Sequence, residues 1–87
     1  MQGNLEIWKG VINGWNSYYI VIKDSILTIC KNKQGESIGK IHLGVARLKT
    51  KDDNLDFIIN NGMEDFEFRT KNMDEKVQWL LAMYKNN

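Results

Sequence analysis

The sequence predicts a mainly β domain in which seven antiparallel strands are followed by one C-terminal α-helix. Short stretches rich in β-branched and aromatic residues recur every eight to ten positions as far as residue 70. Gly, Asn, Asp or Ser residues separate them, which is the rhythm of strands and turns. After residue 70 the apolar residues are spaced four, three and four apart, which is typical of one face of a helix.

Each strand is expected where apolar and polar residues alternate between two turn signals. Asn61-Gly62 is a strong signal for a tight turn, and Asp24-Ser25 marks another. The expected strands cover residues 4–9, 15–23, 26–31, 40–43, 45–50, 55–60 and 65–70.

The C-terminal helix is expected to begin after Asn72, whose side chain can cap the first turn together with Glu75. Such a helix must lie on the sheet to bury its apolar face. The predicted face consists of four residues, widened on one side by two more: Met73, Val77, Leu80 and Tyr84, with Trp79 and Met83.

Length and composition indicate one globular domain, residues 1–87. The chain is 43% hydrophobic and 26% charged, values that exclude a disordered segment. No apolar run reaches the roughly 18 residues that a membrane-spanning helix needs. Cys30 is the only cysteine, so no internal disulfide can form, which fits a reducing, intracellular compartment.

The net charge of +1 conceals an asymmetry along the chain. Residues 1–49 hold seven basic and three acidic side chains, a net charge of +4. Residues 50–87 hold five basic and eight acidic side chains, a net charge of −3. Such a division indicates either a basic end suited to an anionic partner or a chance distribution of solvated charges.

Catalysis and nucleic-acid binding are not expected. One His and one Cys are too few for a zinc quartet of Cys and His, and no sequence motif marks a Ser-His-Asp set, so we expect no enzyme, metal or cofactor. The low net charge and the lack of aromatic residues interleaved with basic ones argue against a nucleic-acid module.

Several motifs resemble those of pleckstrin homology (PH) domains. "GNLEIWKGVINGWNSYYIVI" resembles the opening two strands of the family, "SILTI" the third and "GKIHL" the fourth. "LDFIINNGMEDFEFRTKNMDEKVQWLLAM" is most similar to the domains of oxysterol-binding protein relatives and of the four-phosphate adaptor proteins. The resemblance covers residues 3–84 and implies a PH-like barrel of seven antiparallel strands capped by one C-terminal helix. It also implies a domain excised from a larger protein.

The resemblance implies a membrane-targeting function. The relatives bind phosphatidylinositol 4-phosphate at Golgi-type membranes and recruit a larger lipid-transfer protein. By resemblance, this chain is expected to be a cytoplasmic monomer, peripheral on such membranes, that binds anionic or phosphoinositide lipids. The alternative is a degenerate PH domain that recognises proteins without binding a specific lipid.

The headgroup site of the family depends on basic residues, because they form charge-assisted hydrogen bonds with inositol phosphates. Here Ile7 and Tyr18 occupy two of those positions, and Ile38 occupies a third. His42, at a further position, would help only when protonated. The candidate headgroup residues are therefore Lys9, Tyr18, Lys31, Lys33, Lys40 and His42.

The tip of the first hairpin carries two aliphatic residues, Val11 and Ile12, with Trp8 at its base and Lys9 beside it. In lipid-binding relatives this loop enters the bilayer interface, so Trp8, Val11 and Ile12 are the candidate membrane-insertion residues. The alternatives are that the loop folds back over Ile12 or contacts another domain of the parent protein.

Overall fold

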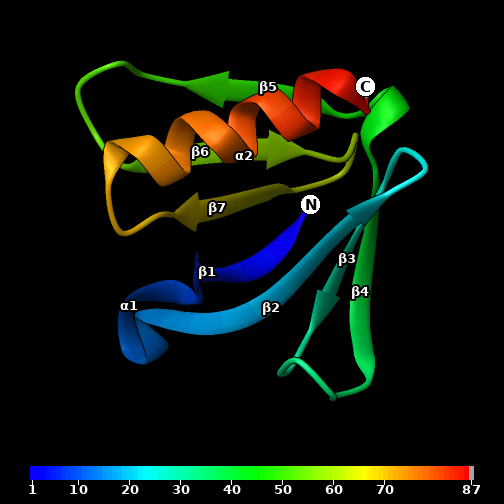
Figure 1. The fold of residues 1–87 in the computed structure, drawn as a ribbon. Coiled ribbons are helices and arrows are strands. Elements are labelled where there is room, and N and C mark those ends of the chain that lie inside the picture. Colours follow the sequence, from blue (N-terminus) through cyan, green and yellow to red (C-terminus); the bar gives the residue numbers. More distant parts are fainter. Residues whose placement is uncertain (87) are drawn as a thin grey trace.

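The computed structural model describes residues 1–86 and contains one seven-stranded antiparallel sheet with a C-terminal helix (Figure 1). The strands are β1 (Gln2–Trp8), β2 (Trp15–Lys23), β3 (Ile26–Cys30), β4 (Ser37–His42), β5 (Arg47–Thr50), β6 (Asp56–Asn60) and β7 (Asp65–Arg69). The helices are a short α1 (Gly10–Asn13), a 3₁₀ turn η1 (Leu43–Val45) and the long α2 (Met73–Lys85). The predicted fold class is confirmed; Asn87, the last residue of the predicted domain, lies outside the described residues.

The sheet has the order β4-β3-β2-β1-β7-β6-β5, so β1 joins a four-stranded half to a three-stranded half. Figure 1 shows the two halves crossing, with α2 lying along the β5–β7 half. Within the described residues β4 and β5 do not pair with each other, and each is an edge strand.

The turns show why the hairpins close where they do. Asp24 and Ser25, with φ angles of 53° and 67°, have the left-handed conformation that a two-residue hairpin turn requires. Gly62, with φ 96°, also has a left-handed conformation, in the four-residue turn between β6 and β7. The Asn60 side chain accepts a hydrogen bond from the Gly62 N–H at 2.8 Å.

Two predicted strands differ most from the structure, while the bounds of the others agree to within two residues. The strand expected at 40–43 begins earlier, at Ser37, because residues 37–42 pair with β3 around an irregularity between Ile29 and Cys30. The strand expected from Val45 is wrong at its start, since Leu43–Val45 form the 3₁₀ turn and β5 begins at Arg47. A tight turn is needed there because the chain crosses from one half of the sheet to the other.

The core lies between the two halves of the sheet and α2. Phe57 and Phe68 stack at its centre, with ring centroids 5.3 Å apart. Alternate residues along each strand fill the rest of the core, as expected for a sheet that is buried on one face. The buried apolar residues are Leu5, Ile7, Ile20, Ile22, Leu27, Ile29, Ile41, Leu43, Phe57, Ile59, Phe68, Trp79 and Met83.

The predicted buried face of α2 is wrong in part. Trp79 and Met83 are buried, but Met73, Val77 and Tyr84 are exposed. The helix is turned so that its largest side chain, Trp79, covers the end of the barrel. There a Cβ added to Gly3 would lie 3.3 Å from the Trp79 ring, so glycine permits the close contact.

Candidate functional site

The tip between β1 and β2 is a single helical turn, α1, and not the open loop expected from the sequence. The Lys9 N–H donates to the Gly14 carbonyl at 2.8 Å, and the Gly14 N–H donates to the Gly10 carbonyl at 2.7 Å. Gly10 and Gly14 have φ angles of 92° and 62°, which a residue with a Cβ adopts only at a cost. The first predicted strand accordingly ends at Trp8, one residue early.

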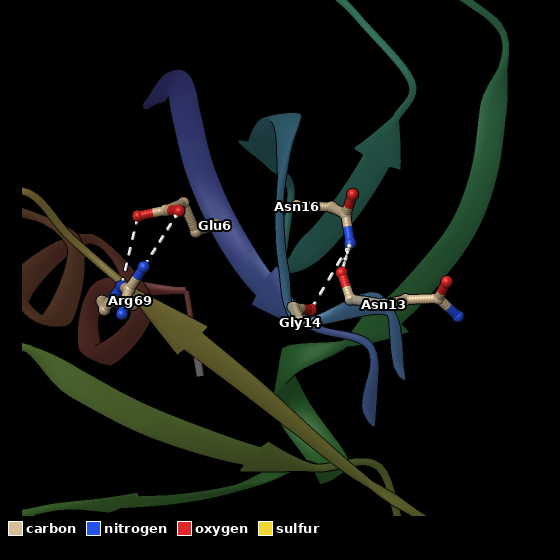
Figure 2. Close-up of polar contacts among 5 residues, drawn as sticks. All are labelled: Glu6, Asn13, Gly14, Asn16 and Arg69. Atoms are coloured by element: carbon tan, nitrogen blue, oxygen red, sulfur yellow. Dashed lines mark hydrogen bonds and ion pairs between the residues drawn. The ribbon is translucent and has the colours of Figure 1, made fainter. Parts of the chain in front are cut away.

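The two aliphatic residues of the tip point into solvent. Val11 is 93% exposed and Ile12 is 96% exposed, so the alternative in which Ile12 packs beneath the loop is wrong. The Asn16 side chain donates to the carbonyls of Asn13 and Gly14 at 3.0 and 3.4 Å and ties the tip to β2 (Figure 2). The chain therefore holds two apolar side chains in water on an internally hydrogen-bonded turn.

An aromatic and ionic cluster forms the foot of the tip. Trp8 and Trp15 are directly opposite each other on β1 and β2, and their ring centroids lie 5.4 Å apart. The Arg69 guanidinium lies 4.3 Å from the centre of the Trp15 ring and donates two hydrogen bonds, of 3.1 and 3.2 Å, to Glu6 (Figure 2). These contacts join β1, β2 and β7 directly below α1.

Sequence reasoning missed Arg69 and Trp15 as supports of the tip. Arg69 is 63 positions from Glu6, and the two side chains meet because β1 pairs with β7. The only local signal was the alternation around Phe66 and Phe68, which places Arg69 on the outer face of its strand.

Two of the candidate headgroup residues, Lys9 and Tyr18, lie close together beside the tip. We call the surface around these two residues the mouth of the barrel. The Lys9 ammonium lies 5.1 Å from the centre of the Tyr18 ring, a cation–π contact. Ile7, at a position where the resemblance leads us to expect a basic residue, is buried in the core and only 2% exposed. A headgroup at this mouth would therefore meet Lys9 and the Tyr18 hydroxyl, with no cation at position 7.

The other candidate residues are spread over two further regions. Lys31 and Lys33 are exposed on the loop between β3 and β4, at the same end of those strands as the tip. Lys40 and His42 flank the buried Ile41, so both are on the outer face of β4. His42 pairs with Ile26 at the start of β3, beside the β2–β3 turn. Lys31 follows the other end of β3. The structure thus brings Lys9 and Tyr18 into contact, places Lys31 and Lys33 on a loop at the same end of the strands, and leaves Lys40 and His42 on the outer face of β4.

No site for a metal is formed within residues 1–86, where no three His, Cys, Asp or Glu side chains gather closely enough to hold one. No helix of the described chain is both long and apolar enough to cross a membrane.

Solved structures with the same fold come from PH domains. No protein-family model matches the sequence, and no curated protein matches it. The PH domain of human oxysterol binding protein-related protein 11 superposes with a TM-score of 0.82 at 20% identity, over 95% of this chain and 75% of that one. The PH domain of human TBC1 domain family member 2 gives a TM-score of 0.85 at 19% identity, over 99% and 78%. The chain has the PH domain fold.

A third similar structure contains an inositol phosphate. The C-terminal PH domain of pleckstrin, in complex with D-myo-Ins(1,2,3,5,6)P5, gives a TM-score of 0.83 at 15% identity, over 99% of this chain and 92% of that one.

Proposed function

We propose that this domain targets its parent protein to membranes that carry anionic or phosphoinositide lipids, and that α1 is the part that enters the bilayer. The observation that carries the proposal is the exposure of Val11 and Ile12, at 93% and 96%, on a hydrogen-bonded turn. Two aliphatic side chains held in water gain free energy by entering an apolar phase.

The magnitudes suffice for reversible binding. Full insertion of both side chains would contribute roughly 3–5 kcal/mol, and partial insertion less. Lys9, Lys31 and Lys33 are at the same end of the domain, and each contributes about 1 kcal/mol near an anionic leaflet. Trp8, 38% exposed at the foot of the tip, is suited to the interfacial layer between headgroups and acyl chains.

The finer assignment is phosphatidylinositol 4-phosphate as the preferred lipid, and a lipid-transfer protein of the oxysterol-binding type as the parent. Its support is the resemblance of the second half of the sequence, together with the fold shared with oxysterol binding protein-related protein 11. The fold shared with the pleckstrin domain bound to D-myo-Ins(1,2,3,5,6)P5 supports headgroup binding at the mouth. In this proposal the domain acts in the cytoplasm, peripheral on Golgi-type membranes.

The deciding experiment is co-sedimentation with liposomes of neutral, phosphatidylserine-containing and phosphatidylinositol 4-phosphate-containing composition. The proposal predicts binding to the anionic vesicles at low salt. The absence of the domain from every anionic pellet would overturn it.

Replacing both tip residues, in the variant Val11→Asp/Ile12→Asp, should abolish co-sedimentation, because two charges would have to enter an apolar phase. The melting temperature should change little, since neither side chain is buried. Val45→Asp is the matched control, because Val45 is also an exposed aliphatic residue, at 77%, but lies on η1, at the end of the sheet opposite the tip. A large fall in melting temperature for the tip variant would show that the tip supports the fold instead.

Protein recognition is the second candidate function, and the buried Ile7 favours it. Without a cation at position 7 the mouth lacks one charge that would select a phosphorylated headgroup. If protein recognition is the function, pull-down from a cell extract should capture a partner equally well with the tip variant and at high salt.

A further inference from the structure

Strand β5 is an edge of the sheet, and its side chains alternate in character. Leu48 is half-buried and pairs with the buried Ile59 on the inner face. The neighbouring positions Arg47, Lys49 and Lys51 are basic and exposed, with Arg47 and Lys49 on the outer face of the strand. In the described part of the chain β5 pairs with β6 alone, so the backbone groups along its other side have no strand partner.

Helix α2 lies beside this edge and runs in the opposite direction (Figure 1). Near its start, the Lys76 ammonium donates to the carbonyls of Lys51 and Asn54, just past the end of β5. Near its end, Tyr84 and Leu48 line the same shallow hollow of about 10 Å³. A bound side chain would cover this hollow without filling it, since the hollow has room for about one water molecule. We call the surface between β5 and α2 the β5–α2 groove.

The apolar face of α2 that the sequence predicted as core belongs to this groove. Met73, Val77, Leu80 and Tyr84 share one side of the helix, and Tyr84 places that side toward β5. Met73, Val77 and Tyr84 are 43%, 49% and 60% exposed. From residue 73 to residue 84 a helix rises about 16 Å, which matches roughly five residues of an extended strand.

We propose that the β5–α2 groove binds an extended segment of another protein in which apolar and acidic residues alternate. Such a segment would pair its backbone with the free edge of β5, as in β-strand addition. Its apolar side chains would then lie over Leu48 and Tyr84, on the inner face. Its acidic side chains would fall on the outer face beside Arg47 and Lys49, because side chains on neighbouring strands share faces.

Charge selects this partner over a second copy of the chain. Two β5 strands paired edge to edge would set Arg47 and Lys49 against the same cations, and like charges facing across strands are destabilising. Within residues 1–86 no acidic side chain forms an ion pair with either residue. Asp56 and Glu67 share an outer hollow with Lys49 and Lys51, but they are on β6 and β7, farther from the edge.

The test uses a synthetic peptide of alternating Val and Glu, with a Val and Lys peptide as its control, added to the isotopically labelled domain. We expect amide chemical-shift changes along β5 and in the second half of α2 with the acidic peptide, and none with the basic one. Lys49→Glu should weaken binding by about tenfold or more, because a like charge replaces the complementary one. Lys23→Glu is the matched control, since Lys23 is exposed at the end of β2.

Three results would overturn the proposal: no shift change with the acidic peptide, equal binding of the basic peptide, or shift changes confined to α1 and the β3–β4 loop. Tyr84→Glu adds an independent check on the helix side, and binding unaffected by both Tyr84→Glu and Lys49→Glu would also count against the groove. Because Val11 and Ile12 lie outside the groove, the tip variant should bind the peptide normally. Failure of the membrane proposal is therefore distinguishable from failure of this one.

Discussion

Lys76 shows how one residue can look solvent-exposed in the sequence and prove structural. It is 1% exposed, and its ammonium donates to the Lys51 carbonyl at 2.5 Å, to the Asn54 carbonyl at 2.6 Å and to Asn54 Oδ1 at 3.5 Å. Three acceptors match the three N–H donors of an ammonium group, which offsets the cost of burying it. Lys76 thereby joins the first half of α2 to the loop between β5 and β6.

Lys76→Ala should lower the free energy of unfolding by about 2–4 kcal/mol, since it removes buried methylenes and charged hydrogen bonds together. Lys76→Met keeps most of the packing and should cost less, about 1–3 kcal/mol, for the lost hydrogen bonds. Urea unfolding of both variants measures the two contributions. An unchanged midpoint for Lys76→Ala would contradict the role of Lys76 as a structural anchor.

At the scale of elements, α2 begins where the sequence predicted. The Asn72 side chain accepts a hydrogen bond from the Glu75 N–H at 2.9 Å, and Asp74 and Glu75 lie in the first turn. The cap satisfies an N–H that has no partner inside the helix, and the acidic residues complement the helix dipole. This local chemistry sets the start of the helix without reference to the sheet.

Asn72→Ala should therefore cost about 1 kcal/mol, and the melting temperature should fall by about 4–8 °C for a domain of this size. Asn72→Asp keeps the acceptor oxygen and should remain close to the parent protein. Lys71→Ala, an exposed neighbour that forms no part of the cap, serves as the control in thermal unfolding followed by circular dichroism. Equal losses in all three variants would argue against the cap.

At the scale of the whole molecule, the topology turns the charge asymmetry of the sequence into an asymmetry between two halves. The segment with a net charge of +4 contains β1 to β4, η1 and all of β5 except Thr50, and the segment with −3 contains β6, β7 and α2. Lys9 therefore adjoins the exposed aliphatic pair in the chain, and the β3–β4 loop with Lys31 and Lys33 lies at the same end of the strands. A charged surface and an apolar one can act together on the same bilayer.

Vesicle binding should consequently weaken with salt without vanishing. Raising the NaCl concentration from about 0.1 M to about 1 M shortens the screening length from ~10 Å to ~3 Å and removes most of the lysine contribution. The apolar contribution of Val11 and Ile12 should persist, leaving measurable binding in a flotation assay. Complete release at high salt would show that the tip does not insert.

Much of the fold could be predicted because its signals are local. The alternation of apolar residues, the Asn61-Gly62 turn and the Asn72 cap place strands, hairpins and helix correctly to within a few residues. The site was harder to predict. The exposed pair Val11 and Ile12 was visible in the sequence, whereas the Arg69–Glu6 contact depends on the pairing of β1 with β7.

The buried face of α2 could not be predicted because two apolar faces compete on one helix. Met73, Val77 and Tyr84 have the regular spacing, but Trp79 and Met83 have the contacts with the barrel. Only the shape of the barrel end, where Gly3 leaves room for the Trp79 ring, decides between the two faces.

By itself, the sequence determined the class of fold, the order of its elements and the apolar character of the first hairpin, because these depend on residues near one another along the chain. Only the tertiary structure decided that Val11 and Ile12 stay in solvent, that Lys40 and His42 lie apart from Lys9 and Tyr18, and that one apolar face of α2 borders the free edge of β5. The physical reason is that exposure and proximity depend on which strands pair and how the helix is turned, and both depend on contacts between residues far apart in the chain.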